Sequence, residues 1–227
     1  MHVVRRTSRA RLVSRVIVAT DDERIMEAVQ AHGGEAQMTS ASLTSGTDRV
    51  AEVAVQLDAQ FIVNVQGDEP LIEPSTIDAA IQLLLEDELI QMSTTSEPIT
   101  DVEEVFNPSV VKVAADPDGF ALYFSRSPIP FVRPADGLTL EESLRRDANL
   151  LSNYRKHSGL YAYRAGFLQQ FAQMKPSPLE QLEALEQLRA LENGFPIKVA
   201  SVQHRSIGVD TEQDYERVKR LIEENRV

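Results

Sequence analysis

The 227-residue sequence contains no cysteine and no tryptophan. The lack of cysteine excludes disulfides, cysteine-ligated zinc or iron–sulfur centres and a thiol nucleophile. Uncharged apolar runs reach only about six residues, far short of the ~20 that a membrane-spanning helix needs. Basic residues are fewer than acidic ones, and the net charge of −12 argues against general nucleic-acid binding. An anionic substrate would therefore need local cations or a metal ion.

The N-terminal segment, residues 1–15, is rich in arginine and lacks acids. This composition is compatible with a transit peptide. A surface helix is favoured instead, because the segment leads directly into a strand without a small-residue cleavage site.

The first third of the chain alternates between strand and helix patterns. Short β-rich runs at 15–20, 35–38 and 61–65 are separated by helical patterns at 21–31 and 47–57, and Pro74 begins another helix. This alternation predicts an α/β fold whose parallel sheet is covered on both faces.

The middle of the chain has a different character. Two β-rich runs, 110–115 and 121–125, flank the turn Asp116-Pro-Asp-Gly119, which predicts a hairpin. Strands are expected at 156–164 and 197–202, one amphipathic helix at 179–191, and a capped helix at 211–224. We predict one domain over 1–227, with an inserted β-rich lobe over 91–165.

Two acidic segments are candidates for a metal site. Asp68 lies in Gln66-Gly-Asp-Glu-Pro70, directly after the most apolar strand, and Asp210 precedes the last helix. Ligands of α/β sheets sit beyond the carboxyl ends of strands, and Mg²⁺ prefers carboxylate oxygens. The alternatives are a solvated turn for the first segment and a helix cap for the second.

Three further segments are candidates for substrate contacts. Ser45-Gly-Thr-Asp-Arg49 could bind an anion at a helix N-terminus, although most such loops bind nothing. Alternation along 156–164 places His157, Gly159, Tyr161 and Tyr163 on one face, which we interpret as a polar pocket wall and not a core. The glutamates of helix 179–191 are most simply explained as a solvated face.

These motifs together resemble one family. The segments that carry the resemblance run in order from about residue 2 to residue 220: Ser45-Gly-Thr-Asp-Arg49, Val63-Asn-Val-Gln-Gly-Asp-Glu-Pro70, Asn107-Pro108, Ala121-Leu-Tyr-Phe-Ser-Arg126, Lys156-His157 with Gly159 and Tyr161, Pro176-Ser-Pro-Leu-Glu180, Leu185-Glu-Gln-Leu-Arg189 and Gly208-Val-Asp210. They are similar to the 3-deoxy-manno-octulosonate (Kdo) cytidylyltransferases, or CMP-Kdo synthetases.

The resemblance implies a Rossmann-like, glycosyltransferase-A-like nucleotidyltransferase with a mostly parallel sheet and a β-rich dimerisation lobe. It implies CTP and Kdo as substrates, Mg²⁺ as cofactor, a homodimer, and a cytoplasmic role in lipopolysaccharide biosynthesis. By matching motifs, Asp68 and Asp210 are the expected Mg²⁺ ligands, and Asp68, Arg49 and Gln66 the expected catalytic residues. The expected sugar-acid pocket consists of Arg126, His157, Tyr161, Glu186 and Gln187.

One departure from the family pattern is notable. Members of the family begin with a strand and an arginine- and lysine-bearing loop that holds the CTP phosphates, and this sequence has neither. We therefore expect residues 16–19 and 61–65 to flank an unfilled edge, and the chain to be weakly active or inactive. The alternatives are a non-catalytic paralogue or dimer partner, and a synthetase for a related sugar acid such as sialic acid or 8-amino Kdo.

Overall fold

The structure is a computed structural model that describes residues 1–204, 207–209 and 211–224. Its strands are β1 Ile17–Thr20, β2 Glu35–Met38, β3 Phe61–Asn64, β4 Met92–Pro98, β5 Lys112–Ala115, β6 Ala121–Ser125, β7 Arg155–Arg164 and β8 Ile197–Ser201. Its helices are α1 His2–Thr7, α2 Glu23–Ala31, α3 Gly46–Ala54, α4 Pro74–Glu86, α5 Val102–Phe106, α6 Leu140–Arg146, α7 Ala165–Gln173, α8 Pro178–Glu183, α9 Leu188–Glu192 and α10 Glu212–Glu223, with a 3₁₀ helix at Ala148–Asn153.

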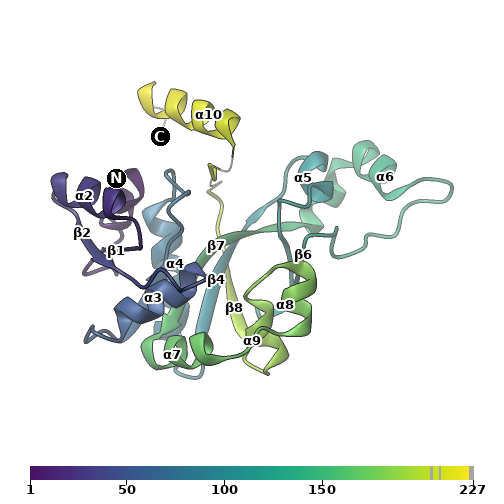
Figure 1. Cartoon of the computed structure of the whole chain (residues 1–227). Helices are drawn as coiled ribbons and strands as arrows, with labels where there is room; N and C mark the ends of the chain where they lie inside the picture. Colours follow the sequence, from purple (N-terminus) through teal and green to yellow (C-terminus); the bar gives the residue numbers. More distant parts are fainter. Residues whose placement is uncertain (205–206, 210, 225–227) are drawn as a thin grey trace.

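A six-stranded sheet forms the centre of the molecule (Figure 1). Its order is β6-β5-β7-β4-β8, and β3 pairs with β7 beside this path. The α/β prediction is confirmed, but the sheet is mixed and not mostly parallel, because β7 runs antiparallel to β3, β4 and β5. Between β4 and β7 the chain adds the antiparallel β5–β6 pair to the same sheet, and β7 then runs antiparallel to β4, so these two strands are not joined by a parallel crossover.

The pairing of β4 with β7 is interrupted in its middle. Thr94 lies opposite Tyr161, but the next residue, Thr95, lies opposite Ser158. Gly159 and Leu160 therefore bulge out of β7 without partners on β4. Such bulges bend a strand and redirect its side chains, and this one lies directly beside the candidate site.

A second sheet contains β1 and β2, which run parallel. Among the strands that the structure describes, β1 pairs with β2 alone and β3 pairs with β7 alone. The two segments expected to flank an unfilled edge thus lie in separate sheets. In Figure 1 the β1–β2 pair, together with α1 and α2, lies to one side of the central sheet.

Three apolar clusters hold these layers together. The largest packs α3, α7 and the α8–α9 segment against the sheet, a second packs α4 and residues 10–13 against the opposite face of β3 and β7, and a third lies within residues 99–154. At the C-terminal end, Thr211 and Asp214 form a capping box that begins α10, as the sequence predicts. No helix in the described ranges is both long and apolar enough to cross a bilayer.

Candidate functional site

The end of β3 is the centre of the candidate site. The strand ends at Asn64, which is buried, and Gln66 follows in the turn. A Cβ on Gly46 would lie 3.8 Å from the Gln66 side-chain oxygen, and a Cβ on Gly159 would lie 3.6 Å from Gln66 Cγ. Gln66 therefore lies between the start of α3 and the bulge of β7. Residues from three separate motifs therefore meet at one strand end.

The N-terminus of α3 is tied to the segment between α8 and α9. Ser45 caps α3 by accepting a hydrogen bond from the Asp48 N–H, and its hydroxyl donates to Glu186 at 3.1 Å. Thr47 donates to the other Glu186 oxygen at 2.7 Å and accepts from Asn64 Nδ2 at 3.3 Å. Burial raises the pKa of Glu186 above its ordinary value, although hydrogen bonds from Thr47 and Ser45 oppose the rise. Glu186 is thus a fixed acceptor at the N-terminus of α3, the helix end that Gln66 also approaches.

The helix expected over 179–191 is broken, and this prediction is wrong. Helix α8 ends at Glu183, Ala184 adopts the left-handed conformation with φ 51°, and α9 begins at Leu188. A non-glycine residue with positive φ is strained and persists where other contacts enforce it. Glu186 and Gln187 therefore lie in a turn and not on a solvated helix face.

Arg126 holds this turn in place. Its guanidinium donates to the carbonyls of Glu183 at 2.7 Å and Ala184 at 3.2 Å, and to that of Pro108 at 2.9 Å. The carbonyl of Arg126 in turn accepts a bond of 2.5 Å from the buried Lys112 ammonium. Arg126, predicted to contact substrate, thus also fixes the turn that carries Glu186.

Gln187 carries an unsatisfied donor. It is 4% exposed, and within the part of the chain that the structure describes its Nε2 has no hydrogen-bond partner. A buried polar atom without a partner is unfavourable and calls for an explanation. A ligand that accepts a hydrogen bond in this turn would provide one.

His157 and Tyr161 lie in a more apolar environment than the strand pattern indicates. Tyr161 and Tyr163 belong to the largest apolar cluster, so the expectation that this face is not part of a core is wrong for the tyrosines. The His157 ring packs edge-on against Phe124 at 5.0 Å and lies 5.2 Å from the Tyr161 ring. Burial lowers the pKa of His157 to about 3 and raises that of Tyr161 well above its usual value. Both side chains are therefore neutral near pH 7.

Because the folded-state pKa of His157 is depressed, its contribution to stability is lost on acidification. The unfolded chain binds a proton at His157 below about pH 6.5, whereas the folded chain stays neutral to about pH 3. We expect the free energy of unfolding to carry an extra slope of about 1.4 kcal/mol per pH unit between these values. In His157→Gln, which keeps an N–H donor, urea unfolding from pH 4.5 to 7 should lack that slope. Exposed His32, changed to Gln, should keep it; equal slopes in both variants would contradict the prediction.

Arg49 contacts residues that follow the carboxyl ends of β1 and β2. Its guanidinium forms an ion pair of 2.7 Å with Asp21, just beyond β1, and donates to Thr39 Oγ1 and the Ser40 carbonyl. Arg49 thus links the loop before α3 to the carboxyl end of β1. Of the three residues expected to be catalytic, Gln66 and Asp68 share one turn after β3, and Arg49 lies at the carboxyl end of β1, in the other sheet.

The donor set near Asp68 fits a divalent cation shared with a substrate. Asp68 is exposed after β3, and its backbone carbonyl accepts a 2.8 Å bond from the Val209 N–H. Asp210, the second predicted ligand, lies outside the described residues. Groups of three or more acidic or histidine side chains that could enclose a metal do not occur among the residues described. One or two carboxylates completed by substrate phosphates and water is the arrangement Mg²⁺ commonly takes.

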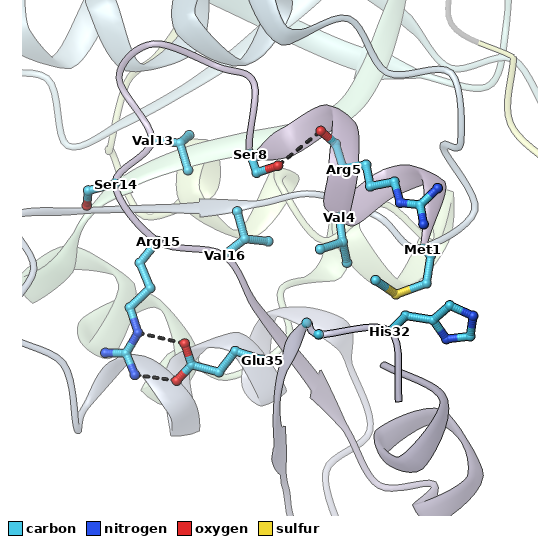
Figure 2. A pocket seen from close by; sticks show the side chains of 12 residues that line it. Met1, Val4, Arg5, Ser8, Val13, Ser14, Arg15, Val16, His32 and Glu35 are labelled. Atoms are coloured by element: carbon cyan, nitrogen blue, oxygen red, sulfur yellow. Dashed lines mark hydrogen bonds and ion pairs between the residues drawn. The ribbon is translucent and has the colours of Figure 1, made fainter. Parts of the chain in front are cut away.

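A cavity of about 380 Å³ lies elsewhere in the molecule (Figure 2). It is enclosed by α1, residues 13–16 and residues 32–35, and Figure 2 shows the Arg15–Glu35 ion pair on its wall. Residues 13–16 precede β1 and residues 32–35 lead into β2, so the cavity lies at the amino ends of these strands, opposite the ends that Arg49 contacts. None of the described residues predicted for the site lines it.

Sequence reasoning missed several residues of the site. Thr47 and Asn64 lie inside motifs in which other residues, Arg49 and Gln66, were predicted to be functional. Thr94 lies in strand β4, which contains no recognisable motif. Lys112 reads as an ordinary strand residue, yet it is fully buried. The only sequence signal for these residues is proximity to motifs in a fold that must be known first.

Comparisons with known proteins show which family this chain resembles. A family model described as Cytidylyltransferase matches residues 1–207. The 3-deoxy-manno-octulosonate cytidylyltransferase of Geobacter sulfurreducens is 53% identical over 217 residues, covering 96% of this chain and 86% of that protein. Its counterpart from Geotalea uraniireducens is 55% identical, covering 96% and 85%.

Solved structures show the same fold. The structure of CMP:2-keto-3-deoxy-manno-octonic acid synthetase complexed with CTP matches with a TM-score of 0.86 and 39% identity, covering 99% of this chain and 87% of that one. HddC from Yersinia pseudotuberculosis has a TM-score of 0.61 at 11% identity, covering 97% and 84%, and is similar in fold alone.

Proposed function

Because this chain belongs to the cytidylyltransferase family, we propose that it transfers the cytidylyl group of CTP to the anomeric hydroxyl of Kdo, giving CMP-Kdo and pyrophosphate. The observation that carries the proposal is the convergence of family-matching residues, Gln66, Glu186 and the His157–Tyr161 pair, at the end of β3. CMP-Kdo would serve lipopolysaccharide biosynthesis.

The C2 hydroxyl of Kdo attacks the α-phosphorus of CTP, a new P–O bond forms, and the bond to pyrophosphate breaks. No covalent intermediate with the protein is required, so the protein contributes positioning and charge. Gln66 lies where the two substrates meet, and the first N–H groups of α3 offer a site for phosphate oxygens. Glu186, Tyr161 and the Gln187 amide supply an acceptor and two donors for the sugar acid.

Asp68 and Asp210 are the proposed Mg²⁺ ligands. When bound, the ion supplies charge neutralisation between two anionic reactants and a protein of net charge −12. We further propose a cytoplasmic homodimer formed through the β-rich lobe over 91–165. Exposed apolar side chains on and near this lobe, Leu122 and Phe131, support a protein contact there.

The test is release of pyrophosphate by the purified chain. We expect any release, including the weak activity expected from the sequence, to occur only when CTP, Kdo and Mg²⁺ are all present, and to be lost with EDTA. Sialic acid and 8-amino Kdo, offered in competition, should be poorer acceptors. Binding of CTP with Mg²⁺ by calorimetry but no turnover with any sugar acid would contradict the proposal.

Gln187 provides a second prediction, which separates stability from activity. Gln187→Met has similar volume and removes the buried donor that lacks a described partner. We expect the free energy of unfolding to stay equal or to rise by up to about 1 kcal/mol, since an unsatisfied buried group is lost. The KM for Kdo should rise about tenfold with the KM for CTP unchanged. A destabilised variant with unaltered KM would show that Gln187 is structural only.

A further inference from the structure

Thr94 lies at the centre of the sheet, at the bulge between β4 and β7. It is fully buried and faces the carbonyl of Leu160, which lies in the bulge, and that of Ser158, which pairs with Thr95. Its hydroxyl oxygen lies 2.6 Å from the Leu160 carbonyl oxygen and 3.3 Å from that of Ser158. The same hydroxyl oxygen lies 2.9 Å from His157 Nε2.

The hydroxyl has a single proton, and the distances decide where it goes. Two oxygens at 2.6 Å repel each other unless a proton lies between them, so Thr94 donates to the Leu160 carbonyl, which can only accept. Thr94 then has only lone pairs to offer His157. The contact at 2.9 Å is a hydrogen bond only if Nε2 carries a proton.

The ring of His157 is otherwise fixed by packing. It lies edge-on to Phe124, with an interplanar angle of 76°, and against Tyr161. Burial keeps it neutral near pH 7. A neutral imidazole protonated at Nε2 has its lone pair on Nδ1.

We propose that Thr94 is a positioning residue that holds His157 in the Nε2–H tautomer, so that Nδ1 accepts a hydrogen bond from a hydroxyl of the sugar acid. This inference rests on the proposed function, which assigns His157 to the sugar-acid pocket. In this hydrogen-bond chain His157 donates to Thr94, and Thr94 donates to the Leu160 carbonyl, which lies in the bulge of β7. A substrate hydroxyl can donate to Nδ1 and extend this hydrogen-bond chain. A substrate group that can only accept would be repelled by the Nδ1 lone pair.

The chain offers closely matched variants for a test. Thr94→Val removes the hydroxyl with little change in shape, and Thr94→Ser retains it. Thr95→Val is the control: Thr95 is equally buried and adjacent, but its hydroxyl has no hydrogen-bond partner among the described residues.

The first readout is the tautomer of His157, from long-range ¹H–¹⁵N correlation spectra of the full chain without ligands. The sequence has four histidines, so comparison with His157→Gln assigns the signal. We expect the proton on Nε2 in the wild type, Thr94→Ser and Thr95→Val, and loss of this single tautomer in Thr94→Val. A wild-type ring protonated at Nδ1 would overturn the inference whatever the enzyme does.

The second readout is steady-state kinetics with Kdo and CTP varied separately. In Thr94→Val the KM for Kdo should rise about tenfold, equivalent to one hydrogen bond, while the KM for CTP stays unchanged. Thr94→Ser should restore the KM, and Thr95→Val should not alter it. An unchanged KM for Kdo in Thr94→Val, with the tautomer lost, would overturn the positioning role. The spectra need no turnover, so failure of the proposed function would be recognised separately by absent transfer in the wild type.

Discussion

Replacing Asp68 with asparagine is expected to lower Mg²⁺-dependent cytidylyl transfer by about 10²- to 10³-fold, the range typical for loss of a group that stabilises developing charge. Asparagine has nearly the same shape but lacks the charge that attracts a cation. Asp68 is exposed, so the unfolding temperature should stay the same. The measurement is pyrophosphate release as a function of Mg²⁺ concentration.

The control for this prediction is Asp58→Asn. It removes the same charge from an exposed position before β3 and should leave both rate and Mg²⁺ dependence unaltered. Transfer by Asp68→Asn at the wild-type rate and at the same Mg²⁺ concentration would remove Asp68 from the metal site. Full activity restored by higher Mg²⁺ would instead agree with a weakened ligand.

The second large effect concerns the stability of the segment that carries Glu186. Arg189 → Met is expected to lower the free energy of unfolding by about 3–5 kcal/mol, because it leaves a buried carboxylate without its partner. Arg189 donates to Glu180 at 2.8 and 2.5 Å and to the Met174 carbonyl at 3.1 Å. Burial alone would raise the pKa of Glu180, but the bonds from Arg189 and the Ser177 N–H bring it below its ordinary value. Urea unfolding at pH 7 measures the loss.

Two variants make that prediction specific. Arg145 also contacts two carboxylates, Glu103 and Glu141, but on the surface, and Arg145→Met should unfold like the wild type. The double variant Arg189→Met with Glu180→Leu should recover most of the stability, because no buried charge is left unpaired. A mild effect of Arg189→Met, equal to that of Arg145→Met, would contradict a stabilising role for the buried pair.

Local patterns predict the elements whose contacts are also local. The apolar run before Gln66 is β3, the turn at 116–119 joins β5 to β6, and Thr211 caps α10. In each case the residues that dictate the structure lie within a few positions of it. The position of Gln66 and Asp68 at a strand end followed from the same reasoning.

The 179–191 segment shows where this reasoning fails. Leucines at every third position predict one helix, yet Leu182 is 82% exposed while Leu185 and Leu188 are buried. The helix breaks at Ala184 because two arginines hold the flanking residues. Arg126, distant in sequence, binds the carbonyls of Glu183 and Ala184, and Arg189, on the next helix, binds the Glu180 carboxylate. The leucine spacing indicates a local preference for helix, and tertiary contacts such as these override it.

The bulge in β7 is unpredictable for the same reason. Its register depends on β3, β4 and β5 together, and the alternation of residues 156–164 continues through it without interruption. The proposed role of Thr94 depends on this bulge, because the bulge places the Leu160 carbonyl against the Thr94 hydroxyl. Its role follows from the paired strands and not from any motif in β4.

Strand β7 also has a consequence for the order of assembly. It is the shared neighbour of β3, β4 and β5, and its partners lie roughly 40 to 100 positions earlier in the chain. During synthesis on the ribosome, those three strands emerge with edges that no later segment yet covers. The site at the end of β3 can therefore form only after residue 164 has been made, and a nascent chain stalled before that point would expose strand edges to aggregation or to chaperones.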